Sequence, residues 1–194
     1  MHIPPIFSYP EAILFWIVFI WSFTLEIRHS GITAGAPSNP QDAGTHRLIN
    51  IGSDIALFLA FLASFLPWFV ISHPRMALDA GTALLITGSL FRRTCFRILG
   101  RYFTAAVIVK ADQPVIEDGP YRWIRHPGYT AGFMVFLGIG LALGSWLSLV
   151  IFLLEMCLVY SRRVKAEEKA LLETLGEPYR AYMARTKRFI PFIF

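Results

Sequence analysis

The sequence predicts an all-α integral membrane protein with about five transmembrane helices. Hydrophobic residues make up 55% of the 194 residues and charged residues only 16%, whereas soluble domains carry about a quarter charged residues. Several apolar stretches approach the ~20 residues that cross a hydrocarbon core of about 30 Å. Lys and Arg residues, in addition, concentrate in alternate connections between these stretches. The bilayer is therefore the expected solvent for most of the chain.

The expected spans are residues 13–27, 51–71, 76–90, 129–143 and 146–160. Because no Lys or Arg precedes the first run and no small-residue cleavage site follows it closely, we expect a retained helix rather than a secretory signal. Residues 52–54, Gly-Ser-Asp, suit the cap of the second helix, and Pro67 is expected to kink it. The His73-Pro74 pair makes a tight connection to the third span, which ends in the basic cluster Arg92, Arg93 and Arg97.

The last two spans are expected to form a tight antiparallel helical hairpin. Only Gly144 and Ser145 separate them, and such short connections join neighbouring antiparallel helices. Two Gly-x-x-x-Gly spacings, Gly128 with Gly132 and Gly140 with Gly144, permit close helix contact in this region.

Charge placement tests the five-span prediction independently. The N-terminal segment has no Lys or Arg and the second connection has one, whereas the first connection has two, the third has seven and the tail after the last span has eight. Seventeen of the eighteen basic residues therefore lie on one side, which the positive-inside rule makes cytoplasmic. We expect the N-terminus outside and the C-terminus inside.

This topology brings the two most polar segments, residues 92–127 and 161–194, to the same face. A site built from both is geometrically possible. Turn signals at residues 112–114 and 117–120 indicate that the first of these segments is largely an irregular loop.

The tail is expected to begin as a helix over residues 162–175 that continues the fifth span into water. Gly176 and Pro178 are expected to stop it. Arg163 and Glu167 are four residues apart and share one face of this helix. An ordinary solvated charge pair is the simplest interpretation of this spacing, since such pairs are common and weak.

Residues 121–129 read YRWIRHPGY, a dense aromatic and cationic cluster at the mouth of the hairpin. The simplest interpretation is an interfacial anchor, because Trp, Tyr and Arg gather at membrane surfaces. Pro127 suits the first position of a helix, and a single histidine such as His126 is more often structural than catalytic.

Several classes of protein are excluded. Cys95 and Cys157 have neither CxxC spacing nor a nearby second ligand, which argues against a disulfide or a zinc site. His29, His46 and His73 stand singly in different loops and are not read as metal ligands. Nucleic-acid binding is not expected, because the net charge of +5 marks cytoplasmic loops. The soluble methyltransferase fold is excluded by the absence of a glycine-rich strand-to-helix turn.

The polar segments carry four motifs in a fixed order. They read Gly-x-Tyr-Arg-Trp-Ile-Arg-His-Pro-x-Tyr from Gly119, Glu-Glu-x-x-Leu from Glu167, Leu-Gly-Glu-x-Tyr-x-x-Tyr from Leu175, and Arg-Phe-Ile-Pro from Arg188. In order and spacing, roughly residues 88–192 resemble the isoprenylcysteine carboxyl methyltransferase family and its wider group of phospholipid and small-thiol methyltransferases. Residues 88–194 are thus the expected methyltransferase-like region. Residues 1–87, two spans and the start of the third, carry no such motif and are expected to be scaffold.

The resemblance implies S-adenosylmethionine as cofactor. It assigns cofactor binding to Gln113, Pro114, Val115, Ile116, Tyr121, His126, Pro127, Gly128, Tyr129 and Glu167. Glu167 is the expected charged partner of the cofactor. Arg163 matches the position near the methyl acceptor, where a guanidinium suits a carboxylate better than a lysine does. We expect it to orient the substrate.

The implied reaction is methylation of a carboxylate on a lipidic or prenylated small molecule or peptide. A carboxylate is already ionised at neutral pH and needs no general base, whereas an amine or thiol acceptor would favour one, with His126 the only histidine in the motif region. The chain is similar to compact prokaryote-type members, which implies a prokaryotic inner membrane and leaves the identity of the acceptor open.

Alternatives remain open at this stage. They are a phospholipid amine or small-thiol methyltransferase, a nicotinamide-dependent membrane reductase with a similar C-terminal helical arrangement, and a non-catalytic membrane scaffold or transporter. Glu155 lies inside the fifth span and is either functional or paired with a neighbouring helix, whereas capping accounts for Asp54. The sequence gives no signal for oligomeric state or for the route by which a lipid reaches the site.

Overall fold

The computed structural model describes residues 2–31, 42, 44–110 and 112–190. Within these residues the chain is helical, and extended backbone pairs only in two isolated bridges, Val70 with Ser145 and Ile124 with Lys187. The all-α prediction is confirmed.

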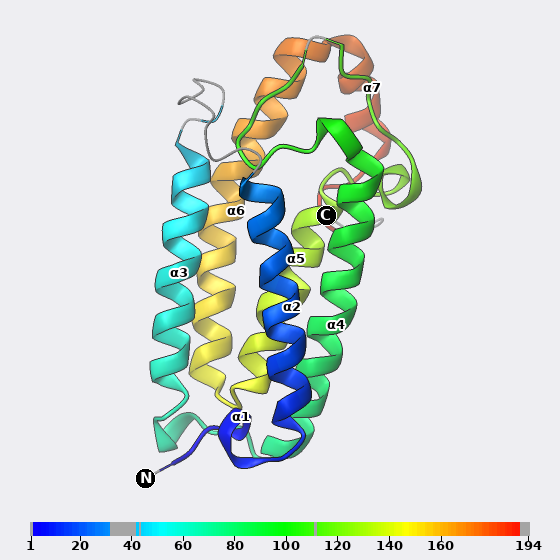
Figure 1. Ribbon diagram of the computed structural model, residues 1–194. Helices are drawn as coiled ribbons and strands as arrows, with labels where there is room; N and C mark the ends of the chain where they lie inside the picture. The colour runs from blue at the N-terminus through cyan, green and yellow to red at the C-terminus, as the bar shows by residue number, and fades with distance from the viewer. Residues whose placement is uncertain (1, 32–41, 43, 111, 191–194) are drawn as a thin grey trace.

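Long helices make up the body of the molecule (Figure 1). They are α2 (Ala12–Gly31), α3 (Thr45–Ala63), α4 (Pro74–Leu99), α5 (Pro127–Ala142) and α6 (Trp146–Leu175). The shorter elements are α1 (Pro5–Ser8), α7 (Glu177–Arg185) and the 3₁₀ turns η2 (Pro67–Phe69), η3 (Gly100–Tyr102) and η4 (Gly119–Arg122).

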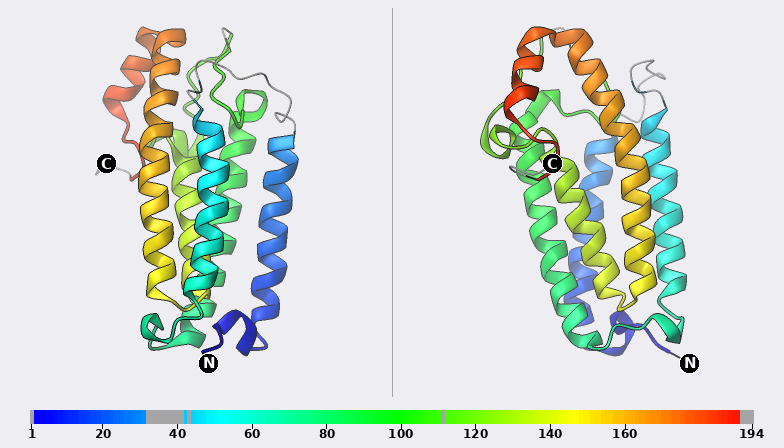
Figure 2. Two further views of the ribbon diagram at one scale, coloured as in Figure 1. Left: turned by 90° about the vertical axis from the view of Figure 1, so that its left-hand side faces the viewer. Right: turned by 180° about the vertical axis from the view of Figure 1, so that it is seen from behind.

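The long helices form a bundle in which chain neighbours run in opposite directions (Figures 1 and 2). Helix α4 packs against α5, α6 packs against α3 and α5, and α2 packs against α4. The connection from α4 to α5, the end of α6 and α7 all lie at the same end of the bundle, opposite the N-terminus. The two polar segments of the sequence therefore meet at one end, as the charge distribution predicts.

The boundaries of α3 differ from the prediction. The helix begins at Thr45 behind Gly44, whose φ of 74° is left-handed, so residues 52–54 lie inside the helix and do not cap it. Its actual cap is supplied from before the helix, because the Asp42 carboxylate accepts a hydrogen bond of 2.9 Å from the His46 amide. The predicted kink at Pro67 is also wrong, since α3 has already ended and Pro67 starts η2.

Helix α4 is longer than the predicted third span. Pro74 is its first residue, behind His73, in agreement with the expected tight connection. The basic cluster at residues 92–97 lies within its last turns rather than beyond its end.

Helix α6 runs without interruption from Trp146 to Leu175, so the predicted helix over residues 162–175 continues the helix that begins at Trp146. Ser145 caps its start, accepting a hydrogen bond from the Ser148 amide. The helix ends at Gly176, whose φ of 62° is left-handed. Pro178 does not contribute to this stop, because it lies in the first turn of α7.

The backbones of α4 and α5 come into close contact at two glycines. A Cβ at Gly138 would lie 2.7 Å from both the Gly81 carbonyl oxygen and the Leu85 amide nitrogen. Two of the glycines in the predicted pairs give close contact with α6: a Cβ at Gly132 would clash with the Tyr160 hydroxyl, and one at Gly140 would lie 2.9 Å from the Leu149 side chain. Gly128 meets only the Phe96 ring, at 3.8 Å. The close approach of the α4 and α5 backbones therefore depends on Gly81 and Gly138, which lie outside the predicted pairs.

We expect Gly138→Ala to destabilise the protein by about 1–3 kcal/mol, because the added methyl group would meet backbone atoms that cannot rotate away. Thermal unfolding in detergent measures the effect. Gly128→Ala is the matched control, since its Cβ has only an ordinary contact with Phe96. Equal unfolding temperatures for the two variants would contradict this account of α4 packing.

Candidate functional site

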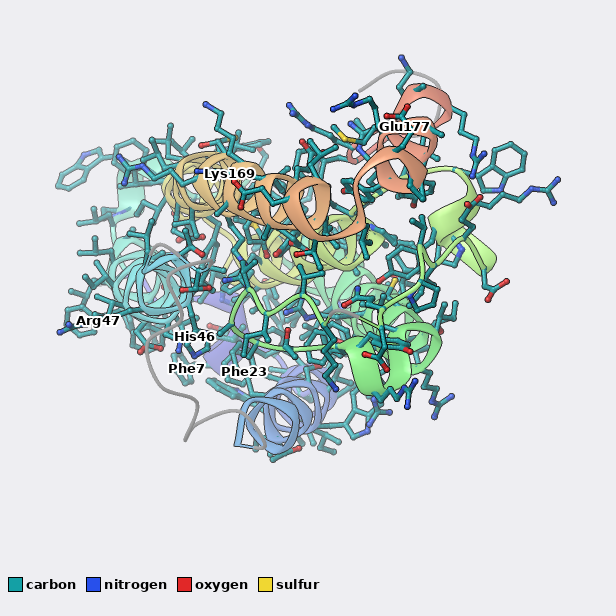
Figure 3. All side chains as sticks on the ribbon, turned by 90° about the horizontal axis from the view of Figure 1, so that it is seen from above. Phe7, Phe23, His46, Arg47, Lys169 and Glu177 are labelled. Carbon is teal, nitrogen blue, oxygen red and sulfur yellow. The ribbon has the colours of Figure 1, made fainter. Side chains whose placement is uncertain are left out.

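A cavity of about 520 Å³ lies at the end of the bundle where the two polar segments meet. Its walls come from α2, α3, α4, the connection between α4 and α5 with its turn η4, α5, the second half of α6 and α7. Figure 3 looks down on this end, with the connection crossing the bundle and Phe23 of α2 and His46 of α3, both cavity-lining, labelled.

The structure brings most of the sequence-predicted site residues together in this cavity. Those that line it are Gln113, Pro114, Val115, Ile116, Tyr121, His126, Gly128, Tyr129, Arg163 and Glu167. Pro127 does not line it, because this residue is buried as the first residue of α5.

The wall formed by residues 113–116 contains an acceptor without a donor. The side-chain oxygen Oε1 of Gln113 is buried and has no hydrogen-bond partner among the described residues. Leaving a buried polar atom unpaired costs about 1–3 kcal/mol. The site therefore suits a ligand that presents an N–H or O–H group here, as an adenine amino group does.

Arg163 and Glu167 do not pair directly; Tyr129 joins them. The Tyr129 hydroxyl donates to Glu167 Oε2 over 2.7 Å and accepts from Arg163 Nε over 3.0 Å. The Glu167 side chain is 32% exposed. It thus presents a carboxylate to the cavity, with its orientation fixed by the tyrosine.

The Arg163 guanidinium is buried and largely occupied by the protein itself. Its Nη1 donates to the Asp42 carboxylate and, over 2.9 Å, to the Thr45 hydroxyl. Its Nη2 donates to the Ala105 carbonyl over 2.6 Å. With Nε on Tyr129, four of the five N–H groups have partners, so little of the fork remains for an acceptor in this geometry.

Asp42 is a site residue that sequence reasoning missed. Besides Arg163 and the start of α3, its carboxylate accepts a hydrogen bond of 2.8 Å from the Val107 amide. Burial opposes its ionisation, but the amides of His46 and Val107 and the Arg163 charge lower the pKa of Asp42 below its usual value. The only sequence signal was its position just before a helix, and the late predicted start of α3 hid it.

Glu168 is the second missed residue, although its motif was recognised. It is 4% exposed. It accepts hydrogen bonds from Arg125 Nε over 3.0 Å and from Arg188 Nη2 over 2.8 Å, and its Oε1 lies 3.3 Å from His126 Nε2. Burial opposes ionisation, but these partners outweigh it and lower the pKa of Glu168 to about 2.

His126 lies between the two adjacent carboxylates. Its Nε2 contacts Glu168, and its Nδ1 is 3.9 Å from Glu167 Oε2. The ring is 4% exposed and packs near the Tyr129 ring, with centroids 5.6 Å apart. The predicted cofactor-binding histidine thus lines the cavity and at the same time joins it to the tail.

The C-terminal segment closes this end of the site. Arg125 donates its amide to the Lys187 carbonyl over 2.7 Å, and the His126 amide donates to Arg188 over 3.0 Å. The Tyr182 hydroxyl of α7 donates to the Tyr121 carbonyl over 2.6 Å. The last two sequence motifs therefore hold the loop in place; Pro191, which ends the last motif, lies outside the described residues.

The remaining candidates lie elsewhere. Glu155 of α6 accepts a hydrogen bond of 3.1 Å from Ser53 of α3 and does not line the cavity. Its second oxygen is buried and, within the ranges that the structure describes, has no partner. Asp54 lines the cavity instead of capping a helix. Cys95 is buried and Cys157 exposed, and both are free thiols.

Comparison with known proteins adds independent findings. The model of the isoprenylcysteine carboxyl methyltransferase family matches residues 81–173, which begins before the expected region and ends before the last motifs. The chain is 35% identical over 115 residues to protein-S-isoprenylcysteine O-methyltransferase of Saccharomyces cerevisiae, covering 58% of this chain and 48% of the yeast protein. It is 30% identical over 112 residues to the enzyme of the same name from Schizosaccharomyces pombe, covering 50% and 48%.

The chain spans about half the length of these two relatives. Its fold matches the solved structure of the eukaryotic intramembrane Ras methyltransferase ICMT with a TM-score of 0.67 and 19% identity, over 97% of this chain and 70% of that chain. At this identity the match shows a shared fold. The comparisons thus relate residues 81–173, just under half of the chain, to the isoprenylcysteine carboxyl methyltransferase family.

Proposed function

We propose that this protein is an S-adenosylmethionine-dependent methyltransferase of the membrane that methylates a carboxylate on a lipidic, isoprenylcysteine-type acceptor. The observation that carries the proposal is the convergence of the family motifs on one cavity, with the Glu167 carboxylate facing it. The names of the relatives support the same reaction.

The cavity fits the proposed cofactor in its donor and acceptor groups. When bound, S-adenosylmethionine supplies a methyl group on a cationic sulfur that leaves as a neutral thioether. Glu167 offers a carboxylate to the positive charges of such a ligand. The unpaired Gln113 oxygen offers an acceptor to its adenine, and Tyr121 and Tyr179 supply aromatic surface in the same walls.

Catalysis by this site would rest on orientation. The acceptor is already an ionised carboxylate, so no residue has to remove a proton; one of its oxygens forms the new bond to the methyl carbon as the carbon–sulfur bond breaks. Holding these atoms in line can supply several kcal/mol of barrier reduction. In this chain Arg163 would act on the acceptor by its charge and its remaining N–H, and through Tyr129 it also fixes Glu167.

The outer surface supports a membrane setting. Large apolar side chains are exposed along α2, α3 and α6, among them Ile13, Ile17, Phe58, Leu154 and Leu158. Of the described helices, Thr45–Ala63 is both long and apolar enough to cross a membrane by composition, and Ala12–Thr24 and Pro127–Ala142 are shorter apolar helices.

We include in the proposal five spans ending in a helical hairpin, the N-terminus outside and the site on the cytoplasmic side, in a prokaryotic inner membrane. The basic residues at the site end of the bundle support this orientation. Membrane lipids are the surrounding partners.

The expected division assigned residues 1–87 to scaffold and residues 88–194 to the site. The second part carries the motifs, but α3 belongs to the first part and contributes several cavity-lining residues. Asp42 and Thr45 also hold Arg163. We therefore propose that residues 1–87 form part of the site as well as its scaffold.

The test is calorimetry on detergent-purified protein. We expect saturable binding of S-adenosylhomocysteine by the wild type and at least tenfold weaker binding by Glu167→Ala, because the cavity loses its carboxylate. Glu173→Ala, an exposed position on the same helix, should bind as the wild type does.

Absence of binding by folded wild type, or saturable binding of a nicotinamide dinucleotide instead, would contradict the proposal. Transfer of the methyl group to phosphatidylethanolamine or to a thiol, and not to farnesylcysteine, would keep the cofactor and overturn the carboxylate acceptor.

A further inference from the structure

Helix α3 forms a polar wall of the cavity. This wall begins near Arg163 and continues along the helix away from it. His46, Asn50, Ser53 and Asp54 line the cavity. Their spacing of three, four and eight residues places them on one face of the helix. This face lies inside the helix that is the strongest candidate for a membrane span.

The polar groups on this face are not all used by the protein. The Asn50 amide and the His46 ring lie within hydrogen-bond distance, at 3.2 Å, and Ser53 donates to Glu155. Within the part of the chain that the structure describes, the Asp54 carboxylate has neither a hydrogen bond nor an ion pair. Asp54 is exposed, so its carboxylate is available to a ligand.

Other parts of the lining are aromatic. They carry Phe23 of α2, Phe96 and Phe103 beside the end of α4, Phe136 of α5 and Tyr160 of α6. The cavity is therefore amphipathic along its length: an apolar body fits against these rings, while hydrogen-bonding groups fit against α3.

The position of Asp54 relative to the reaction centre follows from helix geometry. Thr45 contacts Arg163 directly, over 2.9 Å. Asp54 is nine residues further along α3, which is about 13 Å at ~1.5 Å per residue. An acceptor whose carboxylate lies near Arg163 and whose body follows α3 thus reaches Asp54.

Resting on the proposed function, we propose that the acceptor carries a hydrogen-bond donor, best an amine, on its apolar body about 13 Å from the methylated carboxylate, and that Asn50 and Asp54 select for it. A plain hydrocarbon chain here would strip water from the Asp54 carboxylate and return no partner, which is unfavourable. An amine would form a charge-assisted hydrogen bond with it.

Two probes test this inference: farnesylcysteine, and its analogue with an amino group at the end of the second isoprene unit of the prenyl chain, which lies at about the proposed distance from the carboxylate. Calorimetry on detergent-purified protein saturated with S-adenosylhomocysteine should show at least tenfold tighter binding of the amino analogue by the wild type. In Asp54→Leu the preference should reverse. Asp79→Leu is the matched control, because Asp79 is exposed on α4 and does not line the cavity.

Farnesylcysteine binding as tightly as the amino analogue in the wild type, or a preference that Asp54→Leu leaves unchanged, would overturn the inference. Saturable binding of the cofactor without binding of either probe would also overturn the inference, but it would leave the proposed cofactor site intact. Loss of cofactor binding itself would instead overturn the proposed function, so the two failures are distinguishable.

Discussion

We expect Glu168→Gln to lower the stability of the folded protein by about 3 kcal/mol and to weaken cofactor binding. The neutral amide would leave Arg125 and Arg188 around a buried site without their counter-charge, and breaking a buried ion pair by removing one partner costs about 3–5 kcal/mol. His126, which lines the cavity, would lose its contact with the carboxylate. Thermal unfolding in detergent and calorimetry measure the two effects.

The same variant has a defined pH dependence. The pKa of Glu168 is about 2 in the folded protein against 4.5 ordinarily, so its stabilising contribution is complete above about pH 4.5 and is lost as pH falls toward 2. The stability difference between wild type and Glu168→Gln should shrink over this window. Glu173→Gln, at an exposed position of α6, is the control, and a difference that is constant with pH would contradict the assignment.

We expect Arg163→Lys to lower kcat/KM by on the order of 100-fold. A lysine keeps the charge but has one nitrogen, so it cannot hold Asp42, Ala105 and Tyr129 together as the guanidinium does. Small displacements of the groups that position a substrate lower the reaction rate by factors of this size. Because Tyr129 also fixes Glu167, cofactor affinity should fall together with the rate.

The neighbouring Arg162→Lys is the matched control, since Arg162 is exposed on the same helix and should retain activity. A split result would be informative. If Arg163→Lys raised KM for the acceptor and left cofactor affinity unchanged, Arg163 would act on the acceptor alone, and its role in fixing Tyr129 and Glu167 would be wrong.

The helices could be predicted from the sequence because a long apolar run in a bilayer must satisfy its own backbone hydrogen bonds, which a helix does. The ends of the helices could not be predicted equally well. Helix α3 starts at Thr45 because the Asp42 carboxylate, the Arg163 guanidinium and the Val107 amide meet there, and two of these groups come from distant parts of the chain. Local capping rules favoured residues 52–54 instead.

For the candidate site too, the sequence identified residues but not their contacts. Motif order pointed to Tyr129, Arg163 and Glu167, and the cavity contains all three. Spacing on the helix suggested a direct pair between Arg163 and Glu167, whereas the tyrosine of another helix joins them. The role of Glu168 was hidden because adjacent helical residues face different directions, and only the path of the tail shows which partners each one meets.

The sequence by itself determined the all-helical fold, the resemblance to a methyltransferase family and the segments that form the site, since these depend on hydrophobic runs, charge placement and contiguous motifs. Only the tertiary structure decided that Asp42 holds Arg163, that Glu168 joins the tail to His126, and that α3 lines the cavity with Asn50 and Asp54. These contacts join residues far apart in the chain. Their partners are set by how the helices pack, which no local pattern encodes.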